Sequence, residues 1–151
     1  MKVFNSINEV LDFAMAAEQR AVDLYIGLSE RAKVEDMKQV FMQFAKEEMG
    51  HKARIIKIKE EGTFIIAPEK IIDMKIADYS GEVKATDNLD YQEVLVFAMS
   101  QEKAAFKLYS ALAERAPNNY LKNLFLLLAQ EEAKHKLRFE LEYDEYVLRE
   151  N

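Results

Sequence analysis

Two stretches of this 151-residue chain are near copies of each other: residues 44–55 read FAKEEMGHKARI, and residues 128–139 read LAQEEAKHKLRF. Each copy contains one Glu-x-x-His motif: Glu48 and His51 in the first, Glu132 and His135 in the second. The chain has only these two histidines. Apolar residues recur every three or four positions around both motifs, which is typical of one face of an α-helix. We therefore expect two equivalent helices, each with a carboxylate and an imidazole one turn apart on its apolar face.

The similarity extends over most of both halves of the chain. When the sequence is shifted by 84 residues, 22 of the 46 positions from residue 9 to residue 54 are identical to their partners at 93–138. A shared amphipathic pattern explains matched apolar residues, but it does not explain why the two histidines are partners. The sequence therefore indicates an internal duplication, in which both halves adopt the same fold.

Each half is predicted to form a hairpin of two helices. The apolar spacing predicts helices at residues 7–32, 37–61, 91–116 and 119–149. Gly62 is expected to end the second helix, and Pro117 separates the third from the fourth. Capping pairs lie at the starts of the first and third helices: Ser6 with Glu9, and Asp90 with Glu93.

The connection between the halves, at about residues 62–89, is long for a compact domain. Two hairpins joined by one long crossover can form a four-helix bundle, so we expect an all-α chain with that topology. Residues 1–151 are predicted to be a single domain with repeat halves at about 6–61 and 90–149. Residues 71–79 fit either a short helix or an extended stretch. With only 4 Gly and 2 Pro, a sandwich or barrel of many short strands is excluded.

The composition also limits the chemistry and the partners. The chain has no cysteine, which excludes disulfides, thiolate zinc sites, iron–sulfur clusters and a cysteine nucleophile. The formal net charge of −6 disfavours nucleic acids and anionic membranes as partners. No apolar run approaches the roughly 18 residues of a membrane-spanning helix. The first ten residues lack the apolar core of a signal peptide. We expect a cytoplasmic protein.

Both Glu-x-x-His motifs lie among residues that are expected to face the bundle core, such as Phe44 and Ile55 in the first copy and Phe139 in the second. The first helix of each hairpin adds another inward carboxylate, Glu18 or Glu102, with alanine four residues before it and three after it. Taken alone, each glutamate could be a salt-bridged core residue. Unpaired buried carboxylates cost several kcal/mol or take up protons, so four of them together require compensation.

The full set comprises four glutamates and two histidines from four helices: Glu18, Glu48, His51, Glu102, Glu132 and His135. This is the ligand inventory of a carboxylate-bridged dinuclear metal site in a bundle core. Carboxylates and imidazoles suit iron, manganese or zinc. Four carboxylates neutralise two divalent cations, whereas without metal the like charges would repel one another. The sequence therefore predicts two metal ions per chain.

With these six residues, the sequence resembles the ferritin-like di-iron proteins, and most closely the helical-bundle domain of the rubrerythrins. The resemblance covers nearly the whole chain, and the crossover is its least informative part. It implies a ferritin-like bundle that binds two iron ions. It also implies bridging carboxylates at Glu48 and Glu132, terminal ligands at Glu18 and Glu102, and one imidazole per metal at His51 and His135.

A tyrosine follows each first-helix glutamate by seven residues: Tyr25 after Glu18, and Tyr109 after Glu102. Seven residues is close to two helical turns, so each phenol is expected on the ligand face. In bacterioferritin and rubrerythrin, a tyrosine at this spacing forms a hydrogen bond near the metals. The resemblance implies that role here, and the alternative is a core aromatic residue whose hydroxyl is satisfied elsewhere.

Two features depart from the rubrerythrin pattern. Rubrerythrins usually have a second glutamate three residues after the third-helix ligand, where this chain has Ala105, the partner of Ala21. The site is therefore expected to be symmetric, as in bacterioferritin, and an exchange of carboxylate and histidine ligands is in doubt. Rubrerythrins also carry a four-cysteine rubredoxin domain. This chain has no cysteine, so we expect electrons from an external donor, such as a rubredoxin-like protein or a small reductant.

Glu47 and Glu131 precede the two motif glutamates and point about 100° away from the ligand face. Exposure to solvent and a hydrogen bond to a ligand are both compatible with that direction, and we favour either over metal ligation.

The resemblance implies an oxidoreductase that reduces hydrogen peroxide or dioxygen at a di-iron site. Three alternatives remain open at this stage: ferrous oxidation and iron storage in a cage of subunits, a metal-stabilised bundle without turnover, and a manganese catalase with similar ligands. We expect a homodimer or a larger homo-oligomer.

Overall fold

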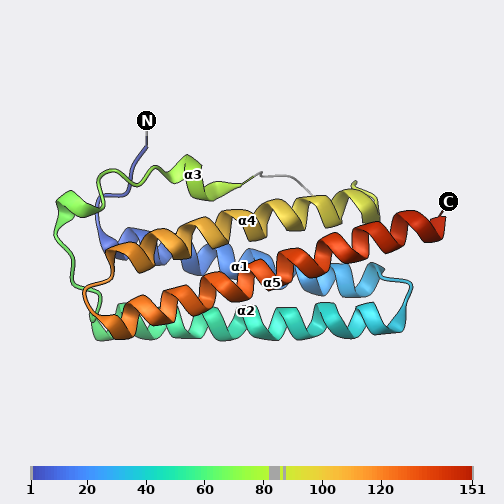
Figure 1. The fold of residues 1–151 in the computed structure, drawn as a ribbon, viewed down its shortest axis with the longest axis horizontal. Helices are drawn as coiled ribbons and strands as arrows, with labels where there is room; N and C mark the ends of the chain where they lie inside the picture. Colours follow the sequence, from blue (N-terminus) through green and yellow to red (C-terminus); the bar gives the residue numbers. More distant parts are fainter. Residues whose placement is uncertain (1, 82–85, 87, 151) are drawn as a thin grey trace.

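The computed structural model describes residues 2–81, 86 and 88–150. Most of them belong to four long helices: α1 (Ile7–Arg31), α2 (Glu35–Glu61), α4 (Tyr91–Arg115) and α5 (Asn119–Glu150). The predicted all-α bundle is confirmed (Figure 1), and each predicted helix boundary lies within two residues of the observed one. None of the described helices combines the length and the apolar character needed to cross a membrane.

The helix ends follow the local sequence. Ser6 caps α1 by accepting a hydrogen bond from the backbone N–H of Glu9 at 3.2 Å. Asp90 and Glu93 form a reciprocal capping box at the start of α4. Gly62 ends α2 with a left-handed backbone conformation, φ 62°, which glycine adopts without steric cost. Local signals therefore set where each hairpin begins and where the first hairpin ends.

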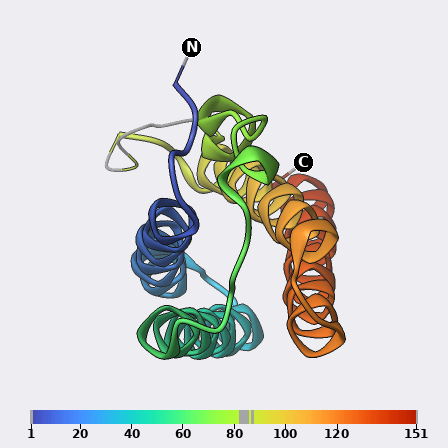
Figure 2. The same ribbon diagram turned by 90° about the vertical axis from the view of Figure 1, so that its left-hand side faces the viewer.

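The helices of each hairpin lie side by side, α1 against α2 and α4 against α5, and α1 also contacts α4. Viewed along their axes, the four helices surround a common core (Figure 2). This arrangement directs the apolar face of every helix toward the other three.

The crossover contains a 3-10 turn at Pro68–Lys70 and a short helix, α3 (Ile76–Ser80), which packs on α4. Helix is thus observed in the second half of the 71–79 segment, for which the sequence left two alternatives open. Val3, near the N-terminus, pairs with Lys75 in an isolated antiparallel bridge. Residues 82–85 and 87 of the predicted crossover lie outside the described residues.

Two apolar clusters fill the bundle, and a polar layer lies between them. In α1, Leu11 and Ala14 belong to one cluster, Val22 and Tyr25 belong to the other, and Glu18 lies between the two. The buried glutamates of α2, α4 and α5 likewise lie between residues of the two clusters, which come in the opposite order along α2 and α4. Each long helix therefore contributes to one buried polar layer that is sealed by apolar side chains on both sides.

Candidate metal centre

The polar layer contains six side chains whose exposed fractions are all 3% or less: Glu18, Glu48, His51, Glu102, Glu132 and His135. The structure therefore brings together all six residues that the sequence nominated as metal ligands. Carboxylates are almost never this deeply buried without a compensating partner.

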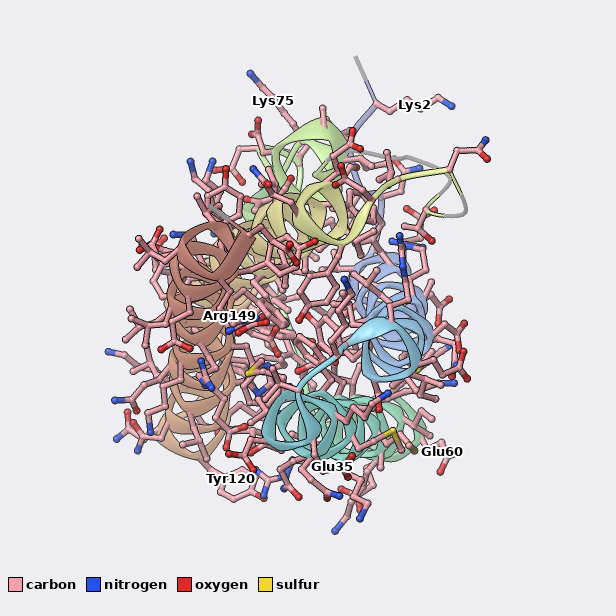
Figure 3. The ribbon with its side chains drawn as sticks, turned by 90° about the vertical axis from the view of Figure 1, so that its right-hand side faces the viewer. Lys2, Glu35, Glu60, Lys75, Tyr120 and Arg149 are labelled. Carbon is pink, nitrogen blue, oxygen red and sulfur yellow. The ribbon has the colours of Figure 1, made fainter. Side chains whose placement is uncertain are left out.

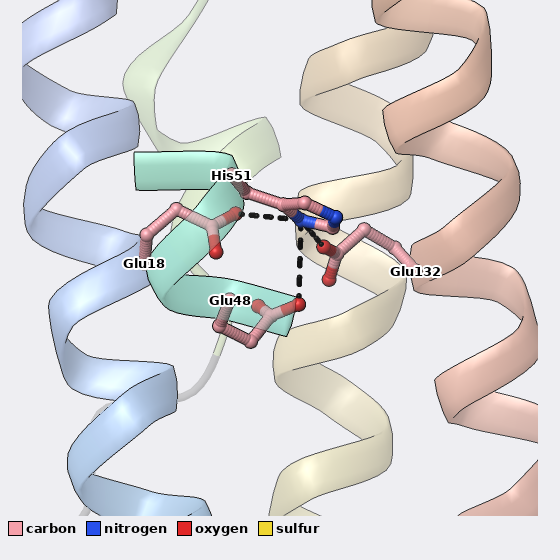
Figure 4. Close-up of side chains that lie close together, drawn as sticks. All are labelled: Glu18, Glu48, His51 and Glu132. Carbon is pink, nitrogen blue, oxygen red and sulfur yellow. Dashed lines mark hydrogen bonds and ion pairs between the residues drawn. The ribbon is translucent and has the colours of Figure 1, made fainter. Parts of the chain in front are cut away.

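The ligand atoms of these side chains form two overlapping groups, in each of which they lie within 4.8 Å of one another. The first group is Glu18, Glu48, His51 and Glu132, and the second is Glu48, Glu102, Glu132 and His135. Figure 4 shows the three carboxylates of the first group converging on His51. Glu48 and Glu132 belong to both groups. Two adjacent metal positions that share two carboxylates have the arrangement of a carboxylate-bridged dinuclear site.

Each histidine directs its Nδ1 atom at the carboxylates. The Nδ1 atom of His51 lies 2.7 Å from Glu132 Oε1 and 3.4 Å from Glu48 Oε1. The Nδ1 atom of His135 lies 3.2 Å from Glu48 Oε1 and 3.5 Å from Glu102 Oε1. Each of the two groups thus has one imidazole nitrogen available as a ligand.

The other ring nitrogen, Nε2, is held by a carboxylate from the opposite hairpin. Glu131 pairs with His51, and Glu47 pairs with His135 at 2.9 Å. An N–H at Nε2 that donates to a carboxylate leaves the Nδ1 lone pair free for a metal and fixes the orientation of the ring. Of the two roles left open for Glu47 and Glu131, the structure shows the hydrogen bond to a candidate ligand.

Both predicted tyrosines are buried in the apolar clusters that flank the layer, with 0% of Tyr25 and 1% of Tyr109 exposed. The hydroxyl of Tyr25 donates a hydrogen bond to Glu102, and the hydroxyl of Tyr109 donates one to Glu18. Burial and the nearby charge of Glu18 raise the pKa of Tyr109 well above its usual value, so this phenol remains a donor at neutral pH. Each tyrosine therefore orients a carboxylate of the other hairpin.

Without metal, the layer retains protons. Burial, and then the charge of Glu48, raises the pKa of Glu18 to about 8. Burial, and then the charge of Glu132, raises the pKa of Glu48 to about 7. Burial and neighbouring carboxylates also raise the pKa of Glu132. Burial opposes protonation of the histidines, but the neighbouring carboxylates outweigh it and raise the pKa of His51 to about 11 and that of His135 to about 12.

Several atoms of the layer are buried without a hydrogen-bond partner: one oxygen each of Glu18, Glu48, Glu102 and Glu132, and Nδ1 of His135. An unsatisfied buried polar atom costs about 1–3 kcal/mol, and more if it is charged. Two divalent cations would coordinate these atoms and replace the retained protons. The donor set and its unsatisfied atoms fit a di-iron site.

A cavity of about 20 Å³ adjoins the carboxylates on the side of α1 and α4. Its apolar wall includes four alanines: Ala17, Ala21, Ala104 and Ala105. Tyr79 of α3 also lines it. The space is about that of one water molecule, and the small alanine side chains leave it open. A small molecule could therefore lie beside the metal positions.

One further buried carboxylate, Glu142, was missed by the sequence analysis. It is 1% exposed, and its Oε2 atom accepts hydrogen bonds from Tyr91 at 2.7 Å and from Arg149 at 3.0 Å. Figure 3 shows Arg149 on the inner side of α5. Glu142 follows His135 by seven residues on the same helix face, and this spacing is the signal that could have identified it.

Comparison with known families agrees with this geometry. The rubrerythrin family model matches residues 9–75 and 93–151, which include nearly all of both repeat halves and all six residues of the polar layer. No curated protein and no solved structure gave a significant match. The 151 residues contain no rubredoxin domain, since that domain requires cysteines and none is present. The chain belongs to the rubrerythrin family.

Proposed function

We propose that this protein holds two iron ions in the polar layer and reduces hydrogen peroxide or dioxygen with electrons from a separate donor. The observation that carries the proposal is the sharing of Glu48 and Glu132 by two ligand groups, which fits two ions rather than one. Dinuclear sites of this kind hold their metals about 3.5–4 Å apart. Membership of the rubrerythrin family supports iron as the metal.

In this proposal both ions would share Glu48 and Glu132, Glu18 and His51 would hold one of them, and Glu102 and His135 would hold the other. When bound, a pair of ferrous ions can supply two electrons together to an O–O bond. The four carboxylates favour the higher positive charge of the oxidised pair. Glu47 and Glu131 keep the imidazoles oriented, and they raise the basicity of each ring as a metal ligand.

The surrounding side chains favour a small oxidant. Ala21 and Ala105 leave space beside the carboxylates, and the apolar clusters above and below exclude bulk water. Tyr25 and Tyr109 hold the two terminal carboxylates in fixed orientations. These features support peroxide or dioxygen as the substrate, because each has only two heavy atoms.

Anaerobic reconstitution with ferrous iron tests the proposal. Elemental analysis should give two iron ions per chain. One equivalent of peroxide per pair should then oxidise both, as followed by the optical absorption of ferric iron. Parallel reactions with dioxygen identify the faster oxidant. The variant Glu48→Ala should lose tightly bound iron, whereas Glu140→Ala, a surface change on α5, should not. Saturation at one ion, or ferrous iron that resists both oxidants, would contradict the proposal.

A further inference from the structure

We propose that the outer face of α5 is the surface through which two copies of this chain associate, with their α5 helices antiparallel and Leu137 on the two-fold axis. This surface lies opposite the face of α5 that carries Glu132 and His135. The proposal therefore goes beyond the proposed function and does not depend on it.

The outer face of α5 carries a line of exposed apolar side chains, which we call the outer stripe. Leu126, Leu137 and Leu148 are 47%, 57% and 77% exposed, and each follows the previous one by 11 residues. Eleven residues are close to three helical turns, so the three leucines lie along one line. Ala133 and Leu141 are also exposed and occupy intermediate turns of the same face. The outer face of an amphipathic helix is ordinarily polar, so the stripe indicates a contact surface.

The repeat shows that the bundle itself does not need the outer stripe. The 84-residue shift places Ala53 of α2 at the position of Leu137. It places Lys57, whose side chain is 73% exposed, at the position of Leu141. The two other stripe positions that fall within α2 hold methionines. The leucines in the C-terminal half of the stripe are therefore particular to α5, and a hairpin of this kind forms without them.

The end of α5 is also open to a second molecule. At 32 residues, α5 is the longest described helix, and its C-terminal end extends past the start of α4 (Figure 1). Tyr91, the first residue of α4, bonds Glu142, so Leu148 lies beyond the end of α4. From Leu126 to Leu148 the stripe is about 33 Å long, which is enough for six turns of helix contact.

The stripe is self-complementary about Leu137. In a two-fold pair of antiparallel helices, a residue before the axis faces the residue that follows the axis by the same number of positions in the second copy. Leu126 and Leu148 both lie 11 residues from Leu137, so each faces the other. Ala133 and Leu141 both lie four residues away, and a small side chain there faces a large one. Every apolar residue of the stripe thus has an apolar partner in a second copy.

Polar residues on this face follow the same symmetry. Gln130 and Asp144 lie seven residues before and after Leu137, so the amide of one copy faces the carboxylate of the other and can donate a hydrogen bond to it. A polar layer within an apolar helix interface fixes its register. Lys134 and Glu145 lie on one edge of the stripe, where the lysine of each copy approaches the glutamate of the other. Contact with an unrelated protein does not require this symmetry, so the pattern favours a second copy.

The first test measures mass. Sedimentation velocity of the full chain at micromolar concentration should give twice the 17.5 kDa mass of one chain. Leu137→Glu brings two like charges together on the axis, and it should raise the dissociation constant of the dimer by about 30-fold or more. The matched control is Ala53→Glu, at the repeat-related position of α2, which should leave the constant unchanged. Circular dichroism checks that both variants remain helical.

The second test measures the register, and a chain without cysteine suits it. Leu137→Cys meets its own copy on the two-fold axis, so mild oxidation should give a disulfide-linked dimer on a denaturing gel. Leu126→Cys alone should not, because its two copies would be about 33 Å apart. A mixture of Leu126→Cys and Leu148→Cys proteins should cross-link to each other. Ala53→Cys is the control and should form no linked dimer.

Three outcomes would overturn the proposal. A chain that remains monomeric would leave the outer stripe to a different molecule, such as a protein electron donor. A dimer that Leu137→Glu weakens no more than Ala53→Glu does would have its interface elsewhere. Disulfides formed by Leu126→Cys alone would indicate parallel helices. Iron binding and oxidation are measured separately, so the proposed function can hold or fail independently of these results.

Discussion

Tyr109 donates its hydroxyl hydrogen bond to Glu18, 91 residues away in the other hairpin. Tyr25 forms the corresponding bond with Glu102, again across the hairpins. The histidines follow the same rule, because each Nε2 atom is held by a glutamate of the opposite hairpin. Each half of the duplicated chain therefore completes the site of the other half.

The tyrosine bonds predict a matched loss of stability. Tyr25→Phe and Tyr109→Phe each remove a donor to a buried carboxylate, which should lower the free energy of unfolding of the metal-free protein by about 1–3 kcal/mol. The repeat predicts similar losses for the two variants. Urea denaturation measures them, and Tyr120→Phe, whose side chain is 76% exposed, is the control. If the free energy of unfolding falls no more in these variants than in the control, the phenols do not stabilise the layer.

Removing one imidazole should remove one metal ion. His51→Ala and His135→Ala each leave a metal position with carboxylates alone, so each variant should retain about one tightly bound ion per chain and reduce peroxide far more slowly. Elemental analysis and circular dichroism check the metal content and the helical fold. Two ions and full turnover in both variants would contradict the assignment of these ligands.

The carboxylates behind the histidines should control affinity rather than stoichiometry. Glu47→Gln and Glu131→Gln weaken the hold on Nε2, and such changes typically reduce metal affinity by about 10–100-fold. Competition with a chelator measures the dissociation constant, and titration should still end at two ions. Glu140→Gln, at a residue that pairs with Lys136 at 2.8 Å, is the control on α5. An unchanged constant for Glu47→Gln and Glu131→Gln would show that they do not act through the rings.

Removing the metal should make stability depend on pH. The pKa values of Glu18 and Glu48 are raised from 4.5 to about 8 and about 7, so the folded metal-free protein binds more protons than the unfolded chain. The free energy of unfolding should therefore fall as the pH rises from 4.5 through about 8. The raised pKa values of His51 and His135 act in the same direction, from 6.5 to about 11 and about 12.

Bound metal should suppress this dependence, because the ions replace the protons. Melting temperatures of metal-free and iron-loaded protein between pH 5 and pH 8 provide the measurement. Parallel curves for the two forms would mean that the proton-binding groups lie elsewhere.

The sequence predicted the helices and the membership of the polar layer, because both follow from periodicity along one chain. Duplication strengthened that prediction, since Glu18 and Glu102 each supported the interpretation of the other. Periodicity shows which face of a helix is buried, but it does not show which neighbouring helix that face meets. The exchange of partners between hairpins, such as Tyr109 with Glu18, therefore appeared only in the structure.

Two other features show the same limit. Glu142 lies in an acidic segment, residues 140–145, whose other acidic residues are exposed or half-exposed. Composition alone therefore does not distinguish Glu142 from these neighbours. The helix α3 has only five residues, too few for a clear apolar period, and its packing on α4 places it. Both features depend on contacts between segments that are distant in sequence.

The two shared carboxylates affect how the protein unfolds. Each candidate ligand group has three residues from one hairpin and the fourth from the other, Glu132 in one case and Glu48 in the other. In a chain without cysteine, the two ions would cross-link the halves, in addition to the long connection and the contacts between the hairpins. Hydrogen exchange in the iron-loaded form would then occur through opening of the whole bundle. With the ions removed, the hairpins could separate first, each still helical.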